Sequence, residues 1–199
     1  MIDAHLRRWI DPPLNRTGDY LAGLGVTANQ VTLLGFALGL TAMLSIALQA
    51  YSLGLGLILL SRLCDGLDGA VARASIITDL GGYLDIVLDF IFYSAIVFGF
   101  VLAQPDHATA GAFLIFSFVG TGTSFLAYST FAAKRGLITR LRGEKSLYYL
   151  GGLIEGFETI TCLILMCLYP NAFWIFAVGF GSLCWLTTLL RLLTAFRTL

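Results

Sequence analysis

Five aspartates lie within the stretch CDGLDGAVARASIITDLGGYLDIVLDF, residues 64–90, in one of the most hydrophobic regions of the chain. Asp65 and Asp68 are spaced i, i+3. Asp85 and Asp89 are spaced i, i+4, so on a helix each pair shares one face. Carboxylates that face one another repel and are costly to remove from water unless a cation lies between them. The pattern therefore predicts a divalent-metal site with all four of these aspartates as candidate ligands.

The available donor atoms limit which metal this site would take. The ligands are oxygens, with no nearby histidine and only Cys64 close by, which favours Mg²⁺ or Mn²⁺ over zinc or copper. Four carboxylates can hold one or two such ions, and paired ions suit phosphoryl chemistry. The alternative interpretation is that individual aspartates pair with Arg62 or Arg73, or cap helices.

The residues between the aspartates favour a bulky phosphorylated ligand. Small residues let such a ligand approach the backbone, and Arg73 offers a forked donor to a phosphate group. These small residues are Gly66, Gly69, Ala70, Ala72, Gly81 and Gly82. Metal, small residues and arginine together predict a pocket for a nucleotide diphosphate.

The elements that must position these residues are membrane-spanning helices. The chain is 58% hydrophobic and only 12% charged, with a mean hydropathy of +0.86, which predicts an all-α polytopic membrane protein. Its long continuous apolar runs favour helices over the alternating strands of a barrel. A chain of 199 residues has room for about six spans of roughly 20–25 residues. We expect these spans at Thr27–Gln49, Ser52–Arg73, Leu80–Ala103, Ala108–Ala132, Ser146–Leu168 and Ala172–Thr194.

A single domain is expected to comprise residues 1–199. Residues 1–26 mix apolar side chains with Arg7 and Arg8, which predicts an amphipathic helix in the membrane interface followed by a linker. Residues 27–196 would form the six-helix transmembrane bundle. All four cysteines fall inside the expected spans, where they are interpreted as small apolar residues rather than a disulfide framework.

Basic residues are distributed asymmetrically across the expected spans. All 12 lysines and arginines except the mid-span Arg62 fall in one half of the membrane, including the loop KRGLITRLRGEK, residues 134–145. The positive-inside rule makes that half cytoplasmic, so both termini and the aspartates are expected on the cytoplasmic side. This face would favour anionic lipids and anionic substrates, and nucleic acid is not implied.

The aspartate motif resembles the signature of the CDP-alcohol phosphotransferases (CDP-alcohol phosphatidyltransferases), D-x2-D-G-x2-A-R-x8-G-x3-D-x3-D. Every fixed position is filled, by Asp65, Asp68, Gly69, Ala72, Arg73, Gly81, Asp85 and Asp89. One departure is visible, because seven residues rather than eight separate Arg73 from Gly81. The segment TANQVTLLGF, residues 27–36, is also similar to the family's T-x-N-x-(V/L)-T entry to the first span. The resemblance identifies the chain as similar to small bacterial inner-membrane members of this family.

The resemblance implies a homodimeric, metal-dependent enzyme of phospholipid biosynthesis in the bacterial inner membrane. It would transfer a phosphatidyl group from CDP-diacylglycerol to a small polar alcohol and release CMP. Asp65, Asp68 and Asp85 would be metal ligands, and Asp89 would be a ligand or the general base for the acceptor hydroxyl. The cofactor would be one or two Mg²⁺ or Mn²⁺ ions. The residues implied to accommodate CDP and its phosphates are Gly69, Ala72, Arg73 and Gly81.

The acceptor alcohol is not determined by the sequence. Candidate acceptor-binding residues follow the fourth expected span, and the loop cations could equally be topology charges. Two glutamates in this segment require partners, either a polyhydroxylated or cationic acceptor or the cations Arg62, Arg191 and Lys145. The candidates are Arg135, Lys145, Tyr148, Glu155 and Glu158.

Two other functions are consistent with parts of the sequence. Transfer from a soluble CDP-alcohol such as CDP-choline to diacylglycerol would use the same motif. A cation-coupled transporter is a more distant alternative, because the carboxylates gather at one membrane face and no inverted repeat is evident.

Overall fold

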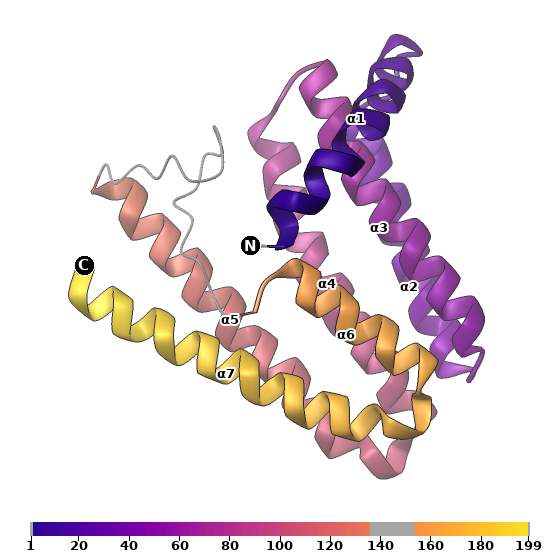
Figure 1. Ribbon diagram of the computed structural model, residues 1–199, viewed down its shortest axis with the longest axis vertical. Coiled ribbons are helices and arrows are strands. Elements are labelled where there is room, and N and C mark those ends of the chain that lie inside the picture. The colour runs from indigo at the N-terminus through magenta and orange to yellow at the C-terminus, as the bar shows by residue number, and fades with distance from the viewer. Residues whose placement is uncertain (1, 136–153, 199) are drawn as a thin grey trace.

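The computed structural model describes residues 2–135 and 154–198, with side chains from Asp11 onward. Within these residues the chain is helical and contains no strand. Figure 1 shows α1–α4 gathered in one half of the molecule and α5 lying beside α7 in the other. The elements are α1 (Ile2–Gly23), α2 (Ala28–Ala47), α3 (Tyr51–Ala74), α4 (Asp79–Ala103), α5 (Ala108–Lys134), α6 (Gly156–Leu168) and α7 (Phe173–Thr198), with 3₁₀ turns η1 (Pro105–His107) and η2 (Pro170–Ala172).

Local sequence signals fix the ends of the helices that approach the aspartates. Thr27 caps α2, accepting the Gln30 N–H at 3.3 Å, while the Gln30 side chain accepts the Thr27 N–H at 2.9 Å. Thr78 caps α4 in the same manner, because its hydroxyl accepts the Gly81 N–H at 3.0 Å. Gly25, with φ of 81°, allows the chain to turn between α1 and α2. The beginnings of α2 and α4 are therefore set by short polar residues.

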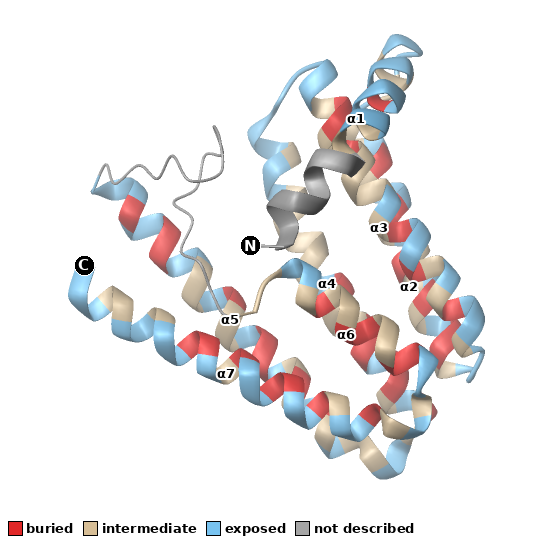
Figure 2. Ribbon diagram, in the orientation of Figure 1, coloured by how far each residue is buried: buried red, intermediate tan, exposed pale blue. Residues whose placement is uncertain are grey.

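The helices pack around α2 and α4. Helix α2 contacts both α3 and α4, whereas α3 and α4 make little direct contact beyond the turn that joins them. Buried glycines let α2 approach its neighbours: Gly35 faces Cys64 of α3, and Gly39 abuts Phe92 of α4. The apolar core includes Phe92, Phe100 and Phe173, all essentially inaccessible. Figure 2 shows buried residues on the facing sides of the helices and exposed residues on their outer sides.

The outer surface is apolar, as expected of a membrane protein. Large hydrophobic side chains such as Leu33, Leu59 and Phe116 are more than half exposed. Four segments are long and apolar enough to cross a membrane, namely 28–47, 79–103, 105–134 and 170–198. The predicted all-α membrane class is thus confirmed in its helical content and its long apolar helices.

The expected span count is not reproduced in full. Helix α3 occupies the second expected span but carries Arg62, Asp65 and Asp68 among its apolar residues, and it falls outside the four spanning segments. Helix α6 has only 13 residues and begins at Gly156, ten residues after the expected start at Ser146, and residues 146–153 lie outside the described part of the chain. The N-terminal segment is helical, and its interfacial placement stays a prediction.

We expect Gly99→Ala to destabilise the protein through the contact between α2 and α4. A Cβ at Gly99 would lie 2.6 Å from the Met43 carbonyl oxygen, so the two backbones would have to separate. We expect a cost of about 1–3 kcal/mol, read as a lower unfolding temperature in detergent. Gly179→Ala is the matched control, because nothing lies within 4 Å of a Cβ there. Equal unfolding temperatures for both variants would contradict this packing.

Candidate active site

Three of the motif aspartates converge where the C-terminal part of α3 meets the beginning of α4. Asp65 and Asp68 come from α3 and Asp85 from α4, and one carboxylate oxygen from each lies within 4.8 Å of the others. Asp68 is buried, with 6% of its surface exposed. The helical spacing i, i+3 places the α3 pair on one face, and the turn from Ser75 to Thr78 brings α4 beside it.

This donor set fits a hard divalent cation. It consists of carboxylate oxygens close enough to contact one ion together, and such clustered carboxylates need a compensating positive charge. The residues that would hold the ion are Asp65, Asp68 and Asp85.

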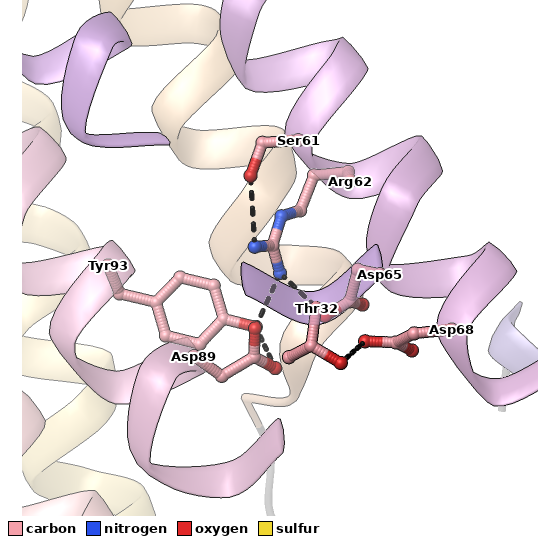
Figure 3. A network of polar contacts seen from close by, with 7 residues as sticks. All are labelled: Thr32, Ser61, Arg62, Asp65, Asp68, Asp89 and Tyr93. Carbon is pink, nitrogen blue, oxygen red and sulfur yellow. Dashed lines mark hydrogen bonds and ion pairs between the residues drawn. The ribbon is translucent and has the colours of Figure 1, made fainter. Parts of the chain in front are cut away.

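Helix α2 supplies a side chain that orients one of these carboxylates. The Thr32 hydroxyl lies 2.6 Å from Asp68 Oδ2 and 3.0 Å from the Ala28 carbonyl oxygen. A hydroxyl has a single proton to donate. The charged carboxylate is the stronger acceptor and makes the shorter contact, so the Thr32 hydroxyl donates to Asp68. Figure 3 shows the Thr32 side chain of α2 donating to Asp68 of α3. The capped start of α2 therefore positions Thr32, the second threonine of the TANQVT segment.

Asp89 lies beside the cluster but is held by different partners. Its Oδ1 accepts a hydrogen bond from Arg62 Nη1 at 2.6 Å, and its Oδ2 accepts one from the Tyr93 hydroxyl at 3.3 Å. Arg62 Nη1 also lies 3.4 Å from Asp65 Oδ1. Figure 3 shows the guanidinium between these two carboxylates. The structure thus separates Asp89 from the three-aspartate group, and its assignment as ligand or base stays a prediction.

The other motif residues line the end of α3 and the start of α4. Arg73 is exposed and donates from Nη2 to the Asn15 side chain of α1 at 2.9 Å rather than to an aspartate. A Cβ on Gly69 would lie 3.3 Å from Arg73 Nη1, so glycine leaves room for the guanidinium. A Cβ on Gly81 would lie 3.1 Å from Thr78 Oγ1 and 3.2 Å from Asn29 Oδ1.

A small cavity connects the aspartates with Arg62. Its volume is about 10 Å³, which is room for about one water-sized group. The lining residues are Thr32, Gly35, Phe36, Ser61, Arg62, Asp65, Asp68, Asp85, Leu88 and Asp89. All four motif aspartates therefore reach one cavity, including Asp89.

Among the predicted acceptor residues, the three that the structure describes, Arg135, Glu155 and Glu158, do not line this cavity. Lys145 and Tyr148 lie outside the described residues. Glu155 precedes α6, where its N–H is capped by Glu158 Oε2 at 3.0 Å. Glu158 also lines a separate groove of about 340 Å³ between α6 and α7, which shares no lining residue with the aspartate cavity.

Arg135 directly follows α5 and donates from Nη1 to the Thr198 carbonyl oxygen at 3.4 Å. Arg62 was one of the cations expected to pair with the glutamates. In the structure it contacts Asp65 and Asp89 instead.

Three residues of the site had no functional assignment from sequence. Thr32 belongs to the TANQVTLLGF segment, and the sequence indicates Arg62 only as a pairing partner for carboxylates. Tyr93 carried no signal beyond lying four residues after Asp89, the spacing that places both on one face of α4. That spacing is the signal that could have identified it.

The structure is that of an α-helical membrane protein in which carboxylates from two helices cluster beside an arginine. This combination is typical of proteins that carry out phosphoryl transfer with a metal ion. The chain belongs to the CDP-alcohol phosphatidyltransferase family, whose model matches residues 25–189. The family resemblance drawn from the motif is therefore confirmed, and members of this family are transferases.

Curated relatives cover the chain to different extents. It is 49% identical over 200 residues to the inner membrane protein YnjF of Escherichia coli, covering 100% of this chain and 97% of YnjF. It is 38% identical over 98 residues to the archaetidylinositol phosphate synthase of Pyrococcus horikoshii, covering 49% of this chain and 52% of that protein.

Solved structures share the fold. Phosphatidylinositol phosphate synthase PgsA1 of Mycobacterium tuberculosis with CDP-DAG bound matches with a TM-score of 0.73 at 20% identity, covering 90% of this chain and 91% of that one. The same synthase in complex with manganese and citrate matches with a TM-score of 0.72 at 21% identity, covering 92% and 88%.

We expect Thr32→Val to weaken Mn²⁺ binding about tenfold, because Asp68 would lose the donor that orients it. The measurement is a titration of free Mn²⁺ by electron paramagnetic resonance. Thr41→Val is the matched control, since Thr41 on the same helix donates only to the Ala37 carbonyl, at 2.9 Å. Equal Mn²⁺ affinities for the two variants would show that the Thr32 contact does not support the site.

Proposed function

We propose that the protein is a divalent-metal-dependent transferase that moves a phosphatidyl group from CDP-diacylglycerol to a small polar alcohol. The observation that carries this proposal is the convergence of Asp65, Asp68 and Asp85 in a chain of the CDP-alcohol phosphatidyltransferase family. The CDP-DAG-bound structural relative supports the choice of donor. The family also favours this enzyme over a cation-coupled transporter.

The reaction exchanges one phosphorus–oxygen bond for another. The acceptor hydroxyl oxygen bonds to the phosphorus that carries diacylglycerol, and the bond from this phosphorus to the CMP oxygen breaks. The hydroxyl proton passes to Asp89, whose Oδ2 retains a lone pair beside the Tyr93 hydroxyl. A divalent ion, Mg²⁺ or Mn²⁺, would neutralise the phosphate charge when bound.

The arginine at the end of α3 would orient the donor. Arg73 is exposed and has a second guanidinium nitrogen next to Gly69, so phosphate oxygens could replace or join its contact to Asn15. Gly69, Ala72 and Gly81 present little side chain along this path, which leaves space for the nucleotide. These roles together assign donor binding to the segment from Gly69 to Gly81.

A phosphorylated polyol is the first acceptor to test. The archaeal relative and the mycobacterial structural relative are both named for inositol phosphate chemistry. The basic loop from Lys134 to Lys145 would attract such an anionic acceptor if it faces the same side as the aspartates. Arg135, Lys145, Tyr148, Glu155 and Glu158 remain the proposed acceptor-binding residues.

The proposed setting is the bacterial inner membrane, with the active site facing the cytoplasm. The relative YnjF is named as an inner membrane protein, and the positive-inside rule supports the orientation. We further propose six spans, with α3 and the region containing α6 completing the four long apolar segments, and a homodimer.

The function is tested by CMP release from purified protein in liposomes. The assay contains CDP-diacylglycerol, Mg²⁺ or Mn²⁺, and in turn glycerol 3-phosphate, inositol, inositol 1-phosphate, serine and choline, with CDP-choline and diacylglycerol as a parallel arm. We expect CMP release from CDP-diacylglycerol that depends on both metal and acceptor. Activity only with CDP-choline and diacylglycerol would replace the proposed donor.

We expect Asp89→Asn to abolish turnover in this assay, a loss of at least about a hundredfold, because the amide cannot take the acceptor proton. Asp79→Asn is the matched control, since Asp79 lies exposed in the first turn of the same helix and outside the cavity. Asp89→Asn turning over at the wild-type rate would refute the assigned base.

We expect both termini to report a cytoplasmic location. Fusions of green fluorescent protein should fluoresce at either end, whereas alkaline phosphatase fused at the same ends should be inactive, because each reporter functions on only one side of the inner membrane. Active phosphatase at the C-terminus together with a fluorescent fusion at the N-terminus would show an odd number of spans and contradict the six-span arrangement.

A further inference from the structure

Helix α1 packs against the part of α3 that carries the signature. A Cβ on Gly18 would lie 2.7 Å from the Ala70 Cβ, and a Cβ on Gly66 would lie 3.0 Å from Leu14 Cδ1. Gly18 is buried in this contact. Figure 1 shows α1 crossing the C-terminal part of α3. The small residues Gly66 and Ala70 therefore make room for α1.

One residue of α1 reaches the signature arginine. Asn15 Oδ1 accepts a hydrogen bond from Arg73 Nη2 at 2.9 Å. The other terminal nitrogen of this guanidinium, Nη1, lies 3.3 Å from the position that a Cβ on Gly69 would take, four residues earlier on α3. The Arg73 side chain therefore runs back along α3 toward the aspartates rather than beyond the end of the helix at Ala74.

Gly69 lies at the border between two faces of α3. At 3.6 residues per turn, Asp65 and Asp68 share one face of the helix. Gly66 and Ala70 share the face that α1 covers, and Gly69 falls between the two faces. A guanidinium held over Gly69 therefore stands beside the aspartate face, where the diphosphate of a metal-bound CDP group would lie.

An exposed arginine in this place needs a partner to keep its orientation. Arg73 is exposed and lies in the last turn of α3, where carbonyl oxygens without helical partners attract basic side chains. Its long side chain also loses rotamer freedom when it is fixed. The contact to Asn15 opposes both effects, because α1 is itself anchored on α3 through Gly18. Helix α1 thus orients Arg73 before a phosphate group arrives.

We propose that Asn15 is a positioning residue that holds Arg73 over Gly69, so that α1 forms part of the site for the CDP-linked lipid. Nη2 stays on Asn15, and Nη1 is left to face a phosphate oxygen. Asn15 lies outside the signature and outside residues 25–189, which the family model matches. This inference rests on the function proposed above and deepens it by adding a residue of α1 to the binding of the diphosphate.

The first test is Asn15→Leu in the CMP-release assay, a change that keeps the size of the side chain but removes the acceptor atom. We expect the KM for CDP-diacylglycerol to rise about tenfold, because Arg73 must then be ordered during binding. The kcat, the KM for the acceptor alcohol and the unfolding temperature should stay at their wild-type values. Thr17→Val is the matched control, since exposed Thr17 on the same helix donates only to the Pro13 carbonyl, at 3.0 Å.

Arg73→Gln shows whether Asn15 acts through the arginine. In calorimetric titrations with CDP and Mn²⁺, Asn15→Leu should weaken CDP binding to the wild-type chain and add nothing to Arg73→Gln. Equal weakening in both backgrounds, or a KM for CDP-diacylglycerol in Asn15→Leu that matches Thr17→Val, would overturn the inference while CMP release still supported the proposed function. A wild-type protein that neither binds CDP nor releases CMP would overturn both.

Discussion

Electrostatic repulsion between carboxylates is the constraint on which the site depends. Asp65, Asp68 and Asp85 lie within 4.8 Å of one another at the meeting of α3 and α4, in a chain whose outer surface is apolar and whose lipid surroundings would screen charge poorly. Such a cluster persists only with compensating positive charge and oriented donors. The Thr32 hydroxyl on Asp68 and the Arg62 guanidinium beside Asp65 and Asp89 supply part of both. A divalent ion would supply the remainder.

The fold serves this cluster through α2. Its capping box starts the helix so that Thr32 faces Asp68, and its buried glycines let it approach α3 and α4 closely. Since α3 and α4 make little direct contact beyond their turn, α2 and the Arg62–Asp89 ion pair link the two aspartate-bearing helices. The opening between α3 and α4 is where the cavity forms, so the packing that stabilises the fold also creates space for a ligand.

Much of the site could be predicted from spacing alone. Helical periodicity places the i, i+3 and i, i+4 aspartates on shared faces, and the resemblance to the family signature singles out the same residues, all four of which line the cavity. The resemblance left Asp89 as either a ligand or the base, and spacing alone could not choose between these roles, because the surroundings of Asp89 depend on which way the Arg62 side chain turns. The short α6 was also missed, since continuous hydropathy does not distinguish a span of 23 residues, 146–168, from a helix that starts only at Gly156.

The central claim is that the α3–α4 aspartates bind a divalent ion at the site where the donor lipid reacts. Anomalous diffraction at the manganese edge, from crystals grown with Mn²⁺ and CDP-diacylglycerol, tests this claim most directly. The account predicts an anomalous peak bounded by Asp65, Asp68 and Asp85, next to the lipid diphosphate. Bound lipid with no peak among these carboxylates, or with the peak elsewhere, would contradict it.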